Sequence, residues 1–408
     1  MKILSVSALF PPHAHGGAEQ SAANLARWLA TLGHEMLVLA ASIADQGDVI
    51  EPWREVNVIR RNFPRPYPVF DFPVAPQWKK PLWHLQDSLD PRNRGIVGRV
   101  LDQVQPDAVL VHYVPGIGYN TLDEISARGL PTVYYLHDLG LACNRMSMFK
   151  SGRDCGSPCA DCRVGSAHRL RRLARFERLG FCSPSLANLE RLKSLLPMSA
   201  WPSTVIPNAN LYPLPTVARM AGTGVLRLLY VGRLHPQKGV DVALEAVAAL
   251  AGQHALQMRV VGGGQSEAEL RARFGGEPWC SFTGHVSPSQ VSDEMNNADL
   301  LLLPSVWLEN APGVAIQALA LGLPIFGSRI GGIPEIVQHD STGWLLPPGD
   351  VTAWTDALRQ LLADPGRLLR WRASAAAQAP QYEQEALGRR HLAFIEQVMT
   401  IKRLSHAS

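Results

Sequence analysis

Short apolar runs alternate with amphipathic stretches along the whole chain. The first run, residues 3–9, precedes a turn and then a stretch in which apolar side chains recur every three or four positions from Ala22 to Leu32. That period indicates a helix with one buried face, and Gly33 directly after it is a typical helix end. A second apolar run follows at 36–41. This strand–helix–strand order predicts a parallel sheet covered by helices.

The same alternation starts afresh in the second half of the chain. Residues 210–224 carry prolines, glycines and small side chains and resemble a linker. Apolar runs then return at 226–231, 257–261 and 300–303. The second half therefore repeats the architecture of the first without repeating its sequence.

Chain length supports a division into two domains. With 408 residues, the chain is longer than a single hydrophobic core usually grows, which is about 250–300 residues. We expect two doubly wound α/β domains, at 1–205 and 206–385, and a final amphipathic helix within 386–408 that packs back on the N-terminal domain. One segment, 50–95, is rich in proline and aromatic residues. We expect it to form a long loop with little regular structure.

Composition excludes several classes of protein. Hydrophobic residues make up 46% of the chain and charged residues 18%, which is typical of a globular cytoplasmic protein. The net charge of +4 is too small to indicate nucleic-acid binding, although it is compatible with anionic substrates or a membrane surface. No apolar run approaches the roughly 18 residues of a membrane-spanning helix.

Four of the six cysteines lie close together in the sequence, at Cys143, Cys155, Cys159 and Cys162. The spacing of the last two is common in structural zinc sites, so a zinc ion held by this cluster is one interpretation. Free thiols in an ordered loop are a second interpretation, and a redox pair is a third.

The apolar run at 300–303 leads into a segment with the features of an anion site. A loop carrying Glu309 follows it, and a helix begins near Pro312 and Gly313. Proline is tolerated in the first turn of a helix, and glycine lets a ligand approach the main chain closely. Free N–H groups at such a helix start attract phosphate. A carboxylate next to a phosphate site suggests that a nucleotide sugar binds there. An ordinary turn between a strand and a helix, with a surface glutamate, fits the same local pattern equally well.

A second candidate phosphate site begins the second half of the chain. The strand ending at Val231 runs into Gly232 and Arg233, and Lys238 follows five residues after the arginine. Arginine matches phosphate oxygens with a planar fork, and lysine adds a mobile charge. Cations at a helix start oppose the helix dipole, so this arrangement favours an anionic ligand.

Four blocks of sequence, taken together, resemble the GT-B-fold retaining glycosyltransferases of family 4. They occur in the order and spacing of that family and span nearly the whole chain. The blocks are Gly16-Gly17-Ala18-Glu19, Val231-Gly232-Arg233 with Lys238-Gly239, Phe282-Thr283-Gly284-His285-Val286, and Pro304-Ser305 through Glu335.

The resemblance implies where the donor's nucleotide diphosphate binds. Gly16 and Gly17 match the glycine loop of the acceptor domain, which closes on the diphosphate. Arg233 and Lys238 match the pair of cations that neutralises it. Val286 matches the position whose backbone meets the base.

The resemblance also places the sugar and the distal phosphate. Glu309 matches the first acid of the family's Glu-x7-Glu motif, which contacts the donor sugar, and His137 matches a histidine close to the transferred sugar. Gly313 and Val314 match the helix start whose amides hold the distal phosphate. The second motif acid is replaced by Gln317, which can contact the ribose hydroxyls without the charge-assisted bond.

A function follows from this resemblance. It implies metal-independent transfer of a hexose-type sugar from a UDP- or GDP-sugar to a glycan or lipid-linked acceptor, in cell-envelope or exopolysaccharide synthesis. Glu309, His137, Arg233 and Lys238 are the expected catalytic residues. The chain contains no Asp-x-Asp, the metal-binding signature of the other large glycosyltransferase fold. We therefore expect no cofactor requirement.

Other functions fit less well. A sugar phosphorylase or epimerase of the same fold lacks support, because no cofactor lysine site is evident. A nicotinamide dehydrogenase needs a Gly-x-Gly-x-x-Gly turn that the glycines at 262–264 do not match. A non-catalytic nucleotide-sugar-binding or scaffold protein remains an alternative, supported only by Gln317. The basic stretch 168–178 predicts an amphipathic helix that either contacts an anionic membrane or is a solvated surface.

Overall fold

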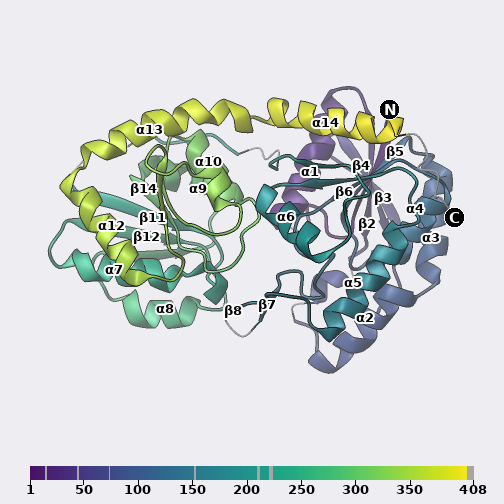
Figure 1. Cartoon of the computed structure of the whole chain (residues 1–408), viewed down its shortest axis with the longest axis horizontal. Coiled ribbons are helices and arrows are strands. Elements are labelled where there is room, and N and C mark those ends of the chain that lie inside the picture. The colour runs from purple at the N-terminus through teal and green to yellow at the C-terminus, as the bar shows by residue number, and fades with distance from the viewer. Residues whose placement is uncertain are drawn as a thin grey trace.

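The computed structural model describes residues 1–13, 16–43, 46–72, 74–150, 153–208, 212–219 and 224–401. Two α/β domains lie side by side, and the C-terminal helices run along one edge from the second domain back to the first (Figure 1). The predicted fold class, two doubly wound domains with a helix that crosses back, is confirmed.

The N-terminal sheet has eight strands in the order β10-β9-β6-β5-β1-β2-β4-β3, and only the β3–β4 pair is antiparallel. The apolar runs of the sequence form its central strands, which helices cover on both faces. The strands are β1 (Lys2–Ser7), β2 (Glu35–Ala41), β3 (Val49–Trp53), β4 (Val56–Arg61), β5 (Ala108–Tyr113), β6 (Thr132–Tyr135), β9 (Leu179–Ser183) and β10 (Ser203–Val205). In a separate two-stranded sheet, β7 (Phe149–Lys150) pairs antiparallel with β8 (Arg153–Asp154).

The helices of this domain connect the strands in turn. They are α1 (Gly17–Thr31), α2 (Lys80–Leu89), α3 (Arg92–Val104), α4 (Asn120–Ala127), α5 (Ala160–Leu173) and α6 (Leu186–Leu195), with short 3-10 turns at Val69–Asp71 and Gln77–Lys79.

The expectation of an irregular loop at 50–95 is wrong, because this segment forms β3, β4, α2 and the start of α3. Three of its prolines occupy positions where a missing N–H does little harm. Pro52 lies in the edge strand β3, Pro81 in the first turn of α2, and Pro91 at the start of α3. The described prolines at 64, 66, 68 and 76 lie between β4 and α2, in backbone that has only two short 3-10 turns. Trp83 of α2 is fully buried in the domain core. A high proline content therefore concealed regular structure.

The C-terminal sheet has six parallel strands in the order β13-β12-β11-β14-β15-β16. They are β11 (Leu226–Val231), β12 (Leu256–Val261), β13 (Cys280–Gly284), β14 (Leu300–Leu303), β15 (Ile325–Ser328) and β16 (Gly343–Leu346). The helices are α7 (Val240–Ala251), α8 (Glu267–Phe274), α9 (Pro288–Asn297), α10 (Gly313–Ala320), α11 (Ile333–Ile336), α12 (Val351–Ala363) and α13 (Gly366–Gln378), with 3-10 turns at Pro236–Lys238 and Ala379–Tyr382. The strand order reverses between β11 and β14, and open α/β sheets bind ligands at such a reversal.

The last helix, α14 (Gln384–Thr400), packs on the N-terminal domain. Its Leu387, Ile395 and Val398 are buried in the same apolar cluster as Trp28 of α1. Gly388 permits this contact, because a Cβ there would lie 2.4 Å from the Trp28 ring. The exact domain boundaries at 205/206 and 385/386 remain predictions. Part of the expected linker, residues 210–211 and 220–223, and the end of the expected last helix, residues 402–408, lie outside the described residues.

Candidate functional site

A cleft of about 310 Å³ lies between the two domains, at the carboxyl ends of their parallel strands. It brings together five of the ten residues predicted for the site. These are Gly17 and His137 of the N-terminal domain, and Arg233, Glu309 and Gly313 of the C-terminal domain. The other five, which are Gly16, Lys238, Val286, Val314 and Gln317, do not line this cavity.

Glu309 is held in one orientation. Its side chain is buried, and its Oε1 accepts hydrogen bonds from Lys238 Nζ at 2.6 Å, Ser305 Oγ at 2.6 Å and Trp307 Nε1 at 3.0 Å. Within the described part of the chain, no donor contacts Oε2. One carboxylate oxygen is thus fixed by the protein, while the other is available to a ligand hydroxyl.

Lys238 reaches Glu309 because the backbone after it turns sharply. Gly239 has a φ of +60°, and a Cβ at that position would lie 2.1 Å from the carbonyl oxygen of Pro304. The turn after β11 therefore packs directly on the end of β14. The sequence predicted Lys238 only as a phosphate ligand, and the structure adds its ion pair with Glu309.

Arg233 faces the glycine loop of the other domain across the cleft. Burial raises the pKa of Glu19, in α1, and the positive charge of Arg233 partly opposes this rise. The Glu19 carboxylate lies against Gly16, where a Cβ would be 2.1 Å from Oε2. The sequence block that begins at Gly16 thus places an acid opposite the arginine, and sequence reasoning gave this acid no role.

The start of α10 has the expected form. Pro312 occupies the N-cap, and no side chain caps the helix, so the amides of Gly313 and Val314 are not covered by a capping group. Gln317, one turn further on, is buried and donates from Nε2 to Ser292 Oγ of α9 at 2.9 Å. Val286, just after β13, packs against the apolar cluster beneath this helix.

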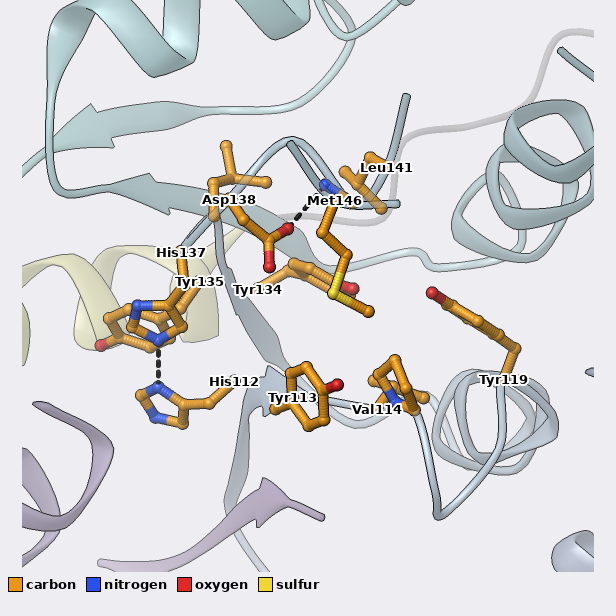
Figure 2. A pocket seen from close by; sticks show the side chains of 13 residues that line it. His112, Tyr113, Val114, Tyr119, Tyr134, Tyr135, His137, Asp138, Leu141 and Met146 are labelled. Atoms are coloured by element: carbon orange, nitrogen blue, oxygen red, sulfur yellow. Dashed lines mark hydrogen bonds between the residues drawn. The ribbon is translucent and has the colours of Figure 1, made fainter. Parts of the chain in front are cut away.

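His137, just after β6, belongs to a stack of buried rings that sequence reasoning missed. Its Nε2 lies 3.0 Å from Nδ1 of His112, which ends β5 (Figure 2). His112 stacks on Tyr135 with ring centroids 4.2 Å apart, and the Tyr135 hydroxyl lies 3.4 Å from His391 of α14. Burial lowers the pKa of His137 to about 4, so this imidazole is neutral near pH 7. A neutral imidazole can bond a sugar hydroxyl without adding charge.

Asp138 follows His137 and points into a second hollow beside the cleft. Tyr113, Tyr119, Tyr134 and Met146 also line this hollow (Figure 2). Burial raises the pKa of Asp138 to about 6, while a hydrogen bond from the Gly140 N–H opposes the rise. The hollow shares His137, Asp138 and Met146 with the cleft. The sequence offered no signal for it beyond the end of a strand.

The cysteine cluster is only partly assembled. Cys143 Sγ and Cys162 Sγ lie 3.8 Å apart, while Cys159 is exposed at the N-cap of α5. Among the described residues there is no group of three or more histidine, cysteine, aspartate or glutamate side chains that could hold a metal ion. The interpretation of this cluster as a zinc site is therefore not supported.

The basic stretch 168–178 is not a continuous amphipathic helix. Helix α5 ends at Leu173, and two of its arginines point inward rather than toward solvent. Arg169 lies over the Tyr119 ring, and Arg172 pairs with Asp123 of α4. In the part of the chain that the structure describes, no helix is long and apolar enough to cross a bilayer.

Comparisons with known proteins identify both halves of the chain. Residues 15–209 match the family described as Glycosyltransferase Family 4, and residues 226–364 match Glycosyl transferases group 1. The chain is 34% identical over 145 residues to the amylovoran biosynthesis glycosyltransferase AmsK of Erwinia amylovora, covering 33% of this chain and 36% of that protein. A glycogen synthase of Mycobacterium tuberculosis is 35% identical over 175 residues, 40% of each chain. The chain thus spans only about a third of the length of the first curated relatives that it matches.

Solved structures match over nearly the whole chain. Sucrose-phosphate synthase from Thermosynechococcus elongatus has a TM-score of 0.75 at 19% identity, covering 98% of this chain and 100% of that one. Anabaena HepE, solved in complex with UDP and glucose, has a TM-score of 0.68 at 17% identity, covering 97% and 100%. At these identities the likeness establishes the shared fold.

Proposed function

The chain belongs to the glycosyltransferases of family 4, and from this premise we propose that it transfers a hexose-type sugar from a UDP- or GDP-sugar to a glycan or lipid-linked acceptor. The observation that carries the proposal is the convergence of Glu309, Arg233 and the start of α10 on one interdomain cleft. The relatives AmsK and WcaL, whose names refer to amylovoran and colanic acid biosynthesis, support a role in making a cell-envelope or exopolysaccharide. HepE, solved with UDP and glucose, supports a nucleotide-sugar donor.

The proposed reaction needs positive charge at the leaving diphosphate. As the bond from the anomeric carbon to the diphosphate breaks, that carbon gains oxocarbenium character and the phosphate oxygen gains negative charge. Arg233 and the Gly313 amide line the cleft, and Lys238 and the Val314 amide lie next to it, through Glu309 and the first turn of α10. We propose that these groups supply the positive charge, since preorganised groups of this kind make large catalytic contributions. The protein itself provides this charge, so we propose metal-independent transfer.

The remaining residues orient the sugar. Oε2 of Glu309 accepts a hydroxyl of the donor sugar, and neutral His137 bonds a second hydroxyl or the ring oxygen. The acceptor hydroxyl attacks the anomeric carbon from the same face from which the diphosphate leaves, and an oxygen of the leaving phosphate takes the proton of that hydroxyl. The anomeric configuration is therefore retained, and no side chain has to act as a base. Gly16, Gly17 and Val286 are proposed to contact the diphosphate and the base, and Gln317 to accept from the ribose through Oε1.

Incubation of the purified protein with a panel of labelled UDP- and GDP-sugars tests this proposal. Sugar transfer, or slow donor hydrolysis that is lost in Glu309→Gln, supports the enzyme. Saturable nucleotide-sugar binding without turnover supports the alternative of a scaffold protein. Absence of both binding and turnover across the panel contradicts the proposed function.

We also propose that the protein contacts the inner face of an anionic membrane through α2. Leu82, Leu85 and Leu89 lie on one side of this helix and are each at least half exposed, and Trp78 just before it is 76% exposed. Lys79 lies over the Trp78 ring, 5.2 Å from its centroid. Apolar side chains at helical spacing next to a cation fit the interface of an anionic bilayer.

The double variant Leu82→Ser/Leu85→Ser is expected to bind vesicles containing phosphatidylglycerol about tenfold more weakly than wild type. Each leucine loses the gain from moving apolar surface out of water into the bilayer. Vesicle co-sedimentation measures this effect. Leu369→Ser, which alters an exposed leucine on α13 of the other domain, is the control and should bind like wild type. Equal binding by the double variant would contradict this membrane surface.

A further inference from the structure

Asn310, directly after Glu309, makes its side-chain hydrogen bonds with the other domain, as far as the described residues go. Its amide Nδ2 donates to the carbonyl oxygens of Leu136 and His137, each at 3.0 Å, and its Oδ1 accepts from Ser185 Oγ at 2.6 Å. A side-chain amide has two N–H donors and one carbonyl oxygen. Every one of these groups is used, and each partner lies on the N-terminal domain.

The partners of Asn310 lie at the cleft or next to it, and His137 lines the cleft itself. Leu136 and His137 directly follow β6, and the Leu136 carbonyl also accepts from Asn188 Nδ2 at 2.9 Å. Ser185 is the N-cap of α6, and its Oγ accepts from the Asn188 amide. One small network thus joins the end of β6, the start of α6 and the loop that carries Glu309.

A second contact between the domains lies next to the first. The Glu335 carboxylate accepts from the backbone N–H groups of Leu186 and Ala187, at 2.7 and 2.8 Å. A carboxylate at a helix N-terminus is a favourable arrangement, here supplied to α6 by the opposite domain. Glu335 of α11 and Asn310 of the Glu309 loop therefore both bond to the start of α6.

The glycine pair before α11 permits both contacts. A Cβ at Gly332 would lie 1.7 Å from the Asn310 carbonyl oxygen and 2.8 Å from Ser185 Cβ. The Gly332 N–H donates to the Glu309 carbonyl at 2.8 Å. The pair at 331–332 thus packs directly against the main chain of the Glu309 loop and against the other domain.

We infer that Asn310 is a positioning residue, whose amide fastens the Glu309 loop to the end of β6 and so sets the distance between Glu309 and His137. The same hydrogen bonds then close the two domains on each other and bring Glu309 and His137 together at the donor-sugar site. The inference rests on the proposed function, because it assigns Asn310 to the same site. It adds a group that touches neither the sugar nor the diphosphate.

The variant Asn310→Asp tests this role with almost no change in shape. Aspartate keeps an acceptor for Ser185, but it loses both N–H donors and places a negative charge against two carbonyl oxygens. We expect kcat for transfer or donor hydrolysis to fall about 10- to 100-fold, the effect of misplacing reacting groups by about 1 Å. We expect Kd for UDP or GDP to stay within about twofold of wild type, because no contact of the diphosphate site is altered.

Small-angle X-ray scattering supplies a readout that does not depend on activity. The radius of gyration of Asn310→Asp should exceed that of wild type, because the fastened cleft opens. Asn57→Asp, which adds the same charge at an exposed position on β4, should match wild type in scattering and kcat. Should Asn310→Asp fail to fold, Ser185→Ala serves instead. It removes the hydrogen bond to Asn310 and the N-cap bond from the Asn188 amide, and we expect kcat to fall about threefold to tenfold.

The outcomes separate the inference from the proposed function. If wild type turns over donor and Asn310→Asp does so equally well with unchanged scattering, the positioning role is wrong while the function stands. If wild type turns over no donor but Asn310→Asp opens the cleft, the fastening stands and the function is wrong. A variant that loses kcat and nucleotide affinity equally would show general damage to the site and would overturn the positioning role.

Discussion

Lys238→Met is expected to lower kcat for sugar transfer by about 100- to 1000-fold, the range seen when one preorganised charge-stabilising group is removed. Two losses combine in this variant. The leaving diphosphate loses a cation, and the Glu309 carboxylate keeps only the neutral donors Ser305 and Trp307. A buried acid without its counter-charge is costly, so we also expect up to about 3 kcal/mol of destabilisation.

Two further variants make this result specific. Glu309→Gln should lose transfer to a similar extent with less destabilisation, because the remaining Lys238 is one quarter exposed and can turn toward water. Lys193→Met removes a lysine from an exposed pair with Glu190 and should change stability by less than about 1 kcal/mol. Steady-state kinetics and urea unfolding measure all three variants. Wild-type rates in both Lys238→Met and Glu309→Gln would show that the site is placed wrongly.

Acidification from pH 7 to pH 5 is expected to lower the free energy of unfolding by at least about 3 kcal/mol. Burial lowers the pKa of His137 to about 4 and that of His391 to about 3, and it holds the pKa of His112 well below its usual 6.5. The unfolded chain therefore binds more protons than the native protein below about pH 6.5. Stability from these three groups is fully present above that pH and is lost as the pH falls toward their folded pKa values.

Asp138 has the opposite effect on the free energy of unfolding as the pH falls. Its folded pKa of about 6 lies above the ordinary 3.8, so its protonation restores stability as the pH falls from about 6 to 4. His137 and His391 each contribute a loss of about 2 kcal/mol at pH 5, and Asp138 returns about 1 kcal/mol. His112 adds a further loss in the same direction as the other two histidines. The histidine effect is therefore the larger of the two.

Urea unfolding at pH 7 and pH 5 measures this dependence. His391→Gln, which keeps a polar side chain near Tyr135 and Cys182 but cannot be protonated, should reduce the pH-dependent loss by about 2 kcal/mol. His254→Gln, at an exposed position after α7, should leave the loss unchanged. If the free energy of unfolding of the wild-type protein is the same at pH 7 and pH 5, then His112, His137 and His391 are not buried in their neutral form.

Much of the architecture could be predicted because it depends on local patterns. The apolar runs at 3–9, 108–112 and 226–231 became buried central strands, since a parallel strand covered on both faces must be apolar throughout. The loop with Glu309 and the helix start at Gly313 lie where the pattern placed them. Each of these features is encoded within a few consecutive residues.

The two predictions that were wrong, for segment 50–95 and for the basic stretch 168–178, share a different cause. Within 50–95, Pro52 and Pro81 resembled loop residues although they lie in an edge strand and in a first helical turn. At these two positions no neighbour needs the N–H that proline lacks. The arginines of α5 resembled a solvated face because their partners, Asp123 and Tyr119, lie some 50 residues earlier in the chain. In both cases the residue pattern was recognised correctly, but the structural surroundings of these residues were predicted wrongly.

The sequence by itself determined the two doubly wound domains, the order of their elements, and the position of Glu309, Arg233 and Gly313 at the ends of strands. The tertiary structure alone decided which groups these residues meet. Lys238 pairs with Glu309, His112 contacts His137, and Asn310 joins two domains through partners more than 120 residues away. Periodicity is a local property of the chain, whereas these contacts exist only after the domains close on each other, and a single sequence carries no local signal for them.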